Sequence, residues 1–161
     1  MDNVDKIIEQ WNRERPELDV TSMGLVGRFK RITQHLTLEM AKTFTEFGLN
    51  PASFDVLATL RRSGPPYALS PNDLIASMMV TSGTMTNRID QLVKTGLVER
   101  IKNPSDARSV SIALTKKGFA LIDSTVTAHV ATQDRLTAGL SESEQNKLNA
   151  LLSKFLKSFE E

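Results

Sequence analysis

Small polar and basic side chains collect on one face of the stretch that follows residue 81. The face consists of small polar residues and one lysine, with an arginine on its flank: Gly83, Thr84, Asn87, Gln91, Lys94 and Arg88. Hydroxyl, amide and guanidinium groups at helical spacing present the donors and acceptors that read base edges in the major groove of DNA. The stretch therefore predicts a recognition helix.

An apolar stripe on the opposite side must hold this helix against a core. Its members recur at i, i+4, i+7 and i+8: Met85, Ile89, Leu92 and Val93. A shorter helix is expected before it, from Ser70-Pro71 to about Met78, because serine caps a helix start, proline suits the first turn and Asp73 complements the dipole. With a break at residues 79–81, the pattern is helix, tight turn, helix.

A β-hairpin is expected after this unit. Gly96 is suited to end the second helix, and residues 97–102 and 109–114 have strand character. The connecting loop carries polar and charged side chains that are free to project: Lys102, Asn103, Asp106 and Arg108. The expected fold is mainly α with a small β-hairpin wing, which is a winged helix-turn-helix.

Positive charge is concentrated in the same region. Residues 81–118 carry 7 Lys/Arg against 3 Asp/Glu, whereas residues 1–80 carry 9 against 10 and residues 119–161 carry 4 against 6. A protein that binds a polyanion such as DNA needs positive charge on the surface that contacts it. Here the positive charge lies on the second helix and the hairpin. An ordinary solvated surface is the alternative explanation.

Composition excludes several other classes. The chain has no cysteine, and its two histidines, His35 and His129, are too few for a usual zinc site. It contains neither an apolar run of about 18 residues nor a sequence motif for nucleophilic or phosphate chemistry. We therefore expect a soluble cytoplasmic protein without catalytic residues, metal or cofactor, and with no membrane partner.

The 161 residues, 40% of them hydrophobic, suffice for one substantial core and are interpreted as a single domain, 1–161. Apolar spacing, prolines and glycines place one helix from about residue 4 to the charged run 13–19, a second from about 22 to 47 and a third from 51 to near 63. A further helix follows residue 115 and can run as far as 138, and the last one starts at the capping box 141–144 and continues to the end of the chain. Residues 51–115 then form the winged helix-turn-helix. Residues 1–48 and 116–161 form flanking helices.

The flanking helices are amphipathic beyond what a small winged domain needs to cover its core. A second subunit is the simplest cover, and two-fold symmetry would place two recognition helices about 34–36 Å apart on a palindromic operator in double-stranded DNA. We therefore expect a homodimer formed by the first and last helices. A monomer whose terminal helices pack on each other is the alternative.

The hairpin and its flanks carry a family resemblance. Asp106-Ala107-Arg108 and the stretch from Val110 to Gly118 resemble the D-x-R wing and the V-x-L-T-x-x-G motif of the MarR family. Residues 96–100, Gly-Leu-Val-Glu-Arg, are similar as well. The resemblance covers nearly the whole chain and implies a dimeric winged-helix regulator, usually a repressor released by a small ligand.

The same resemblance implies which residues contact DNA. It puts Ser82, Thr84, Thr86, Asn87 and Arg88 in or beside the major groove, with Lys102 in the basic wing. Arg108 would enter the minor groove, and Asp106 would orient it. A narrow minor groove attracts a guanidinium, and a carboxylate two residues away holds the side chain extended.

A narrower resemblance links residues 60–67 and 85–90 to the urate-responsive, PecS-like branch of the family. It implies a ligand site made of an aromatic residue, an aspartate and two arginines, at Trp11, Asp55, Arg88 and Arg100. An aromatic plate stacks on a flat heterocycle while guanidiniums pair with its oxygens. Because Arg88 also lies on the recognition helix, its displacement from Asp55 would transmit the signal to DNA.

Simpler roles remain open for these residues. Trp11 fits the apolar face of its helix. Asp55 lies on the opposite side of its helix from an apolar arc, which is typical of a solvent-exposed residue. Arg88 is suited to contact a DNA phosphate. An aromatic carboxylate or a phenol is the alternative effector. A winged helix that contacts only proteins is the alternative function, against which the basic charge on the second helix argues.

Overall fold

The computed structural model describes residues 1–78, 82–103 and 106–160, without the side chains at positions 82, 103 and 106–108. The described residues form seven helices and three strands: α1 (Asn3–Glu14), α2 (Thr21–Glu46), α3 (Pro51–Arg62), β1 (Ala68–Leu69), α4 (Pro71–Met78), α5 (Ser82–Lys94), β2 (Val98–Asn103), β3 (Asp106–Leu114), α6 (Lys116–Thr137) and α7 (Glu142–Glu160). They divide into two compact units, Met1–Met40 and Ala41–Glu161. The predicted break at Met79-Val80-Thr81 lies outside the described residues.

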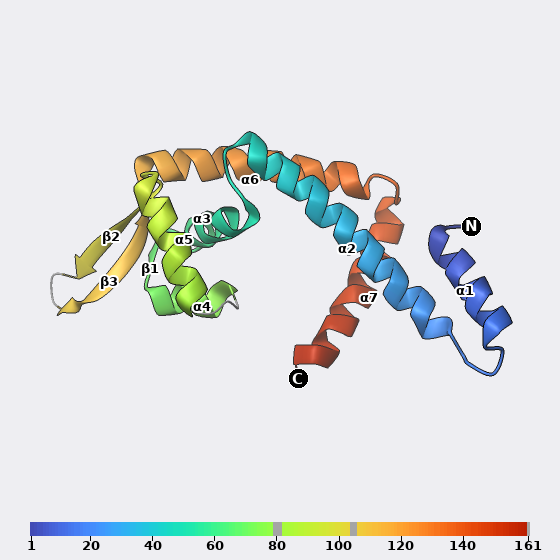
Figure 1. Cartoon of the computed structure of the whole chain (residues 1–161). Helices are drawn as coiled ribbons and strands as arrows, with labels where there is room; N and C mark the ends of the chain where they lie inside the picture. The colour runs from blue at the N-terminus through green and yellow to red at the C-terminus, as the bar shows by residue number, and fades with distance from the viewer. Residues whose placement is uncertain (79–81, 104–105, 161) are drawn as a thin grey trace. The chain divides into compact units, whose positions relative to one another are not determined.

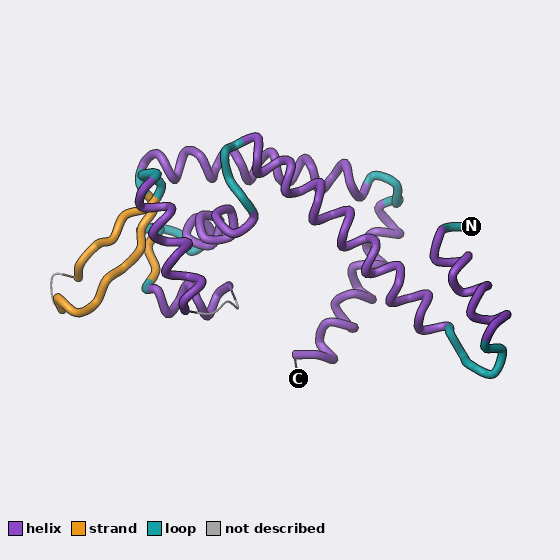
Figure 2. The backbone as a smooth tube through the Cα atoms, viewed as in Figure 1, coloured by secondary structure: helices purple, strands orange, loops and turns teal. Residues whose placement is uncertain are grey.

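In the first unit, α1 lies beside the beginning of α2 (Figure 2). The carboxylate of Asp2 caps α1 by accepting hydrogen bonds from the backbone N–H groups of Val4 and Asp5. Val4 is only 5% exposed and packs against Gly27. A Cβ added to Gly27 would lie 3.3 Å from the Cγ1 atom of Val4. Arg28 of α2 pairs with both Asp2 and Asp5. The N-terminal half of α1 is thus held against α2 by apolar packing and by ion pairs.

The second unit is built around α3. This helix contacts α4, α5, α6 and β3, and its Val56, Leu57 and Leu60 are fully buried (Figure 1). Each neighbouring element contributes at least one fully buried side chain to the same core: Leu74, Met85, Ile112 and Ile122. Asn50 caps α3 by accepting a hydrogen bond from the Ser53 N–H, and Pro51 occupies its first turn, as the sequence predicts.

The sheet is antiparallel with the strand order β1-β3-β2. Two features differ from the sequence-based expectation. A short strand, β1, pairs Ala68 with Ala113 and Leu69 with Ile112. In addition, β3 begins at Asp106 rather than at residue 109, because pairing with β2 continues past an irregularity at Lys102/Asn103 to Asn103 opposite Asp106. The loop of the wing is therefore shorter than predicted, and Asp106 and Arg108 belong to strand β3.

The junction between the wing and α6 is tightly packed. Thr115 caps α6 by accepting a hydrogen bond from the Gly118 N–H at 3.0 Å, and its hydroxyl donates to the Gly96 carbonyl at 2.7 Å. A Cβ on Gly118 would lie 1.9 Å from the Leu97 carbonyl oxygen. A side chain at position 118 would collide with the backbone of Leu97, so glycine is required where α6 begins. Among the described residues, no helix combines the length and the apolar character needed to cross a membrane.

Candidate DNA-binding surface and effector pocket

The recognition helix α5 has the two faces that its sequence predicts. Its apolar side is buried through Met85, Ile89 and Leu92. The other side is solvent-exposed and polar: Thr84, Thr86, Asn87, Gln91 and Lys94. Burial of the apolar stripe fixes the rotation of the helix, so these polar side chains are directed outward. This surface can donate and accept hydrogen bonds along a groove of DNA.

The remaining predicted DNA contacts are divided between α5 and the wing. Lys102 is exposed on β2, and Arg88 is half-buried on α5. Ser82 begins α5, and Asp106 and Arg108 lie on β3, but the side chains of these three lie outside the described part of the structure. Their participation in the interface thus remains a prediction.

Arg88 of α5 is close enough to Asp55 of α3 for its charge to act on that carboxyl group. Burial raises the pKa of Asp55, while the charges of Arg88 and His129 act in the opposite direction. The structure therefore brings together two of the four predicted ligand residues, one from α3 and one from the recognition helix. His129, which the sequence analysis assigned to no site, is the third charged or titratable group in this cluster.

His129 of α6 lies in an aromatic cluster with Phe44 of α2 and Phe54 of α3. The two phenyl rings stack with centroids 4.1 Å apart, and the imidazole centroid lies 5.1 Å from Phe44 and 4.9 Å from Phe54. Its Nδ1 is buried without a hydrogen-bond partner in the described structure. Burial lowers the pKa of His129, and the Asp55 carboxylate partly offsets this effect. The neutral imidazole is therefore favoured.

A pocket of about 280 Å³ opens beside Asp55, between α3 and the end of α4. Its lining is mostly polar: Asp55, Ala58, Thr59, Arg62, Ser77 and Met78. Asp55 is itself exposed to solvent, but it lines this pocket together with Ser77 and Met78 of α4. Sequence reasoning missed Arg62, although its position seven residues after Asp55 places both on one face of the helix.

The other two predicted ligand residues have different surroundings. Arg100 of β2 forms an ion pair with Asp90 of α5, with 2.5 Å between the guanidinium and the carboxylate. Trp11 belongs to the first unit, where it is 40% exposed on α1. Within the described ranges, no His, Asp and Glu side chains gather in a group that could hold a metal ion.

Comparison with known proteins identifies the chain's relatives. The sequence model of the MarR family matches residues 49–110. Over 151 residues, the chain is 40% identical to the HTH-type transcriptional regulator PecS of Dickeya dadantii, a match that covers 94% of this chain and 91% of the relative. The chain belongs to the MarR family. Its predicted likeness to the PecS-like branch is confirmed by the same match.

Solved structures of MarR-family proteins share the fold. A mutant of MarR from E. coli complexed with operator DNA has a TM-score of 0.72 and 26% identity, covering 91% of this chain and 97% of that one. BpsR of Bordetella bronchiseptica, whose DNA binding is regulated by 6-hydroxynicotinic acid, has a TM-score of 0.69 and 26% identity, with coverage of 80% and 90%. This MarR-family chain is therefore a DNA-binding transcriptional regulator and not an enzyme.

Proposed function

We propose that this protein is a ligand-responsive repressor. It binds a palindromic operator as a homodimer and releases it when a small aromatic anion, such as urate, enters the pocket region. The observation that carries this proposal is the proximity of Asp55 on α3 to Arg88 on the recognition helix. A ligand that changes this electrostatic interaction acts directly on the element that reads DNA.

The effector mechanism follows from charge. An anion close to the Asp55 carboxylate is unfavourable unless a cation intervenes or the groups move apart. Arg88 is such a cation, and pairing with the anion would draw it from Asp55 and shift α5. Arg100 would join after leaving Asp90, and Trp11 enters the proposed site on the sequence resemblance alone. A heteroaromatic acid regulates the relative BpsR, which supports an effector of this class.

The DNA contacts are proposed on the polar face of α5 and on the wing. Thr84, Thr86, Asn87 and Ser82 suit base and phosphate contacts in the major groove, and Lys102 and Arg108 suit the flanking backbone and minor groove. Arg88 is shared between the two sites. Sharing this residue makes operator binding and effector binding compete, which is what release from DNA requires.

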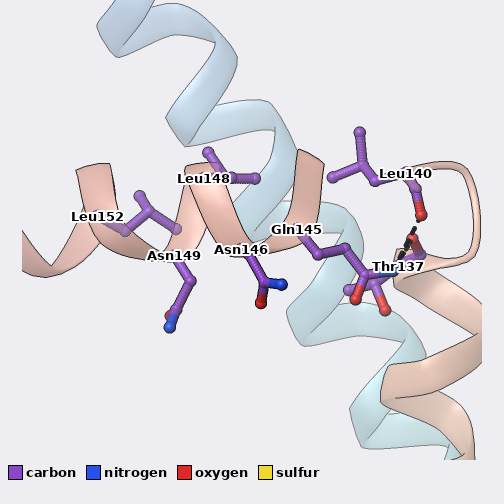
Figure 3. A pocket seen from close by; sticks show the side chains of 7 residues that line it. All are labelled: Thr137, Leu140, Gln145, Asn146, Leu148, Asn149 and Leu152. Carbon is purple, nitrogen blue, oxygen red and sulfur yellow. Dashed lines mark hydrogen bonds between the residues drawn. The ribbon is translucent and has the colours of Figure 1, made fainter. Parts of the chain in front are cut away.

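Dimerisation is proposed through the terminal helices. In α7, large apolar side chains remain exposed from its second turn to its end: Leu148, Leu151, Leu152, Phe155, Leu156 and Phe159. A hollow of about 380 Å³ adjoins this face at the α6–α7 turn, where the Gln145 side chain donates hydrogen bonds to the Thr137 and Leu140 carbonyls (Figure 3). Exposed apolar faces of this size suit burial against a second copy. We propose that the dimer acts in the cytoplasm.

Thermal melting tests the effector. A ligand that binds only the folded protein raises the melting midpoint, so urate is compared with hydroxybenzoates and phenols over the same concentrations. A rise with urate supports the first proposal. A rise with hydroxybenzoate or phenol alone assigns the alternative effector class, and no rise with any of them contradicts ligand sensing by this pocket region.

A further inference from the structure

We infer that Arg28 of α2 is a positioning residue for the effector, because its ion pairs hold α1, the helix that carries Trp11, against α2. The inference rests on the proposed function, which includes Trp11 in the effector site. The Nε of Arg28 lies 2.8 Å from the carboxylate of Asp2, and its Nη2 pairs with the carboxylate of Asp5. One guanidinium of α2 thus binds two carboxylates of α1.

The apolar contact between α1 and α2 is small. Of the 12 residues of α1, all of which the structure describes, only Val4 is buried, and it packs against Gly27. About one turn earlier on α2, Gly24 lies close to Ile8, since an added Cβ would be 3.9 Å from the Cδ1 atom of Ile8. Glycines offer little apolar area, and helices are normally held together by the apolar area that they bury. The Arg28 ion pairs therefore contribute a larger share of this contact than ion pairs usually do.

The two carboxylates that Arg28 binds are already ordered by the cap of α1. The Asp2 carboxylate accepts hydrogen bonds from the N–H groups of Val4 and Asp5, at 2.7 Å and 3.0 Å. In return, the Asp5 carboxylate accepts one from the Asp2 N–H at 2.7 Å. An exposed ion pair is usually weak because two flexible side chains must be ordered to form it. Here the capping box orders both acceptors, so the entropy cost of pairing falls mainly on Arg28.

The position of α1 determines the position of Trp11. Trp11 follows Val4 by seven residues, which is two helical turns, so both side chains lie on the same face of α1. Trp11 is 40% exposed, and its place is therefore set by the helix more than by a surrounding core. If α1 loosens, the indole must be ordered again when a flat heterocycle stacks on it, and this ordering lowers the affinity. Arg28 consequently acts on the effector through Trp11.

A double-mutant cycle tests whether Arg28 acts through Trp11. Urate is titrated calorimetrically into the full chain as wild type, Arg28→Gln, Trp11→Ala and the double variant. We expect Arg28→Gln to weaken urate binding at least about fivefold when Trp11 is present and less than about twofold in the Trp11→Ala background. Arg28→Lys should recover part of the affinity, since lysine keeps the charge but lacks the planar fork that binds both carboxylates. Arg31→Gln, at an exposed position about one turn later on α2, is the matched control and should bind urate as wild type does.

The fluorescence of Trp11 provides a second measurement, which needs no ligand. Trp11 is the only tryptophan in the sequence, so its emission reports on α1 alone. We expect Arg28→Gln to increase acrylamide quenching and to lower the fluorescence anisotropy, whereas Arg31→Gln should change neither. Wild-type quenching and anisotropy in Arg28→Gln would refute the positioning role. A thermal melt of each variant verifies that it is folded.

The outcomes separate this inference from the function on which it rests. If wild-type protein binds urate and Arg28→Gln binds it equally well, the role of Arg28 is refuted while the proposed function stands. If Arg28→Gln weakens binding as much in the Trp11→Ala background as in wild type, Arg28 does not act through Trp11, and the inference is again refuted. If wild-type protein binds a hydroxybenzoate but not urate, the same variants are titrated with that compound and judged by the same criteria. If it binds neither, the proposed function fails together with the inference.

Discussion

The guanidinium of Arg100 on β2 pairs with the carboxylate of Asp90 on α5, which ties the wing to the recognition helix. Asp90 follows Arg88 by two residues on the same helix, and Arg88 interacts electrostatically with Asp55 of α3. An effector that recruits Arg100 must take it from Asp90. The same event would then release the recognition helix from both the wing and α3.

Replacing Arg100 separates its structural role from its proposed ligand role. The pair is exposed, with 42% of the Arg100 side chain and 46% of the Asp90 side chain accessible, and exposed pairs contribute less than about 1 kcal/mol. We expect Arg100→Ala to change the free energy of unfolding by no more than this and to abolish urate-dependent release of DNA. Chemical denaturation and a DNA-binding titration measure the two effects. A fully urate-responsive variant would remove Arg100 from the site.

Asp55 should reduce stability at neutral pH. Because burial raises its folded-state pKa above the ordinary value, the folded state holds the proton more strongly, and stability falls as pH rises through this range. We expect Asp55→Asn to melt at a higher temperature than wild type at pH 7, with the difference vanishing near pH 3, below the ordinary pKa of about 3.9. A variant less stable than wild type at pH 7 would contradict this origin of the pKa shift.

His129 should make the fold sensitive to mild acid. Its pKa is lowered by burial, so the unfolded chain binds the proton more readily, and stability decreases as pH falls below about 6.5. We expect the wild-type melting temperature to drop between pH 7.5 and pH 5.5, and the drop to be smaller in His129→Phe, which keeps an aromatic ring beside Phe44 and Phe54. His35→Gln, at an exposed position on α2, is the control and should retain the wild-type pH profile.

Gly118 tests the packing between the wing and α6. A methyl group there would meet the Leu97 carbonyl oxygen at 1.9 Å, a backbone atom that cannot rotate away. We expect Gly118→Ala to lower the free energy of unfolding by at least about 2 kcal/mol. Gly139→Ala places the same methyl group where no atom lies within 4 Å, and should change stability by less than about 0.5 kcal/mol. Equal stability of the two variants would mean that the close approach does not exist in solution.

Local signals in the sequence predict most of the fold. Caps and breakers at Asn50-Pro51, Ser70-Pro71 and Thr115 place helix starts where the structure has them, because capping acts over three or four residues. The two-residue strand β1 was not predictable in this way. It is too short to show alternation, and its existence depends on β3, more than 40 residues later.

The candidate site was predicted only in part, for a similar reason. The polar face of α5 is a property of one helix, so spacing alone reveals it. The Arg100–Asp90 pair, the Arg62–Ser77 hydrogen bond and the aromatic surroundings of His129 join separate elements, and periodicity carries no information about such contacts. Arg62 could be predicted in part. Its helical spacing from Asp55 is visible in the sequence, but the pocket that both residues line also needs a wall from α4, which the sequence does not show.

Effector-dependent release from DNA tests the central claim most directly. Fluorescence anisotropy of a labelled duplex from the region flanking the gene is measured with wild-type protein, with and without urate. We expect affinity that falls steeply with salt, because phosphate contacts release counterions, and dissociation when urate is added at constant salt. Operator affinity unchanged by urate well above micromolar concentrations would contradict the claim that this regulator senses urate.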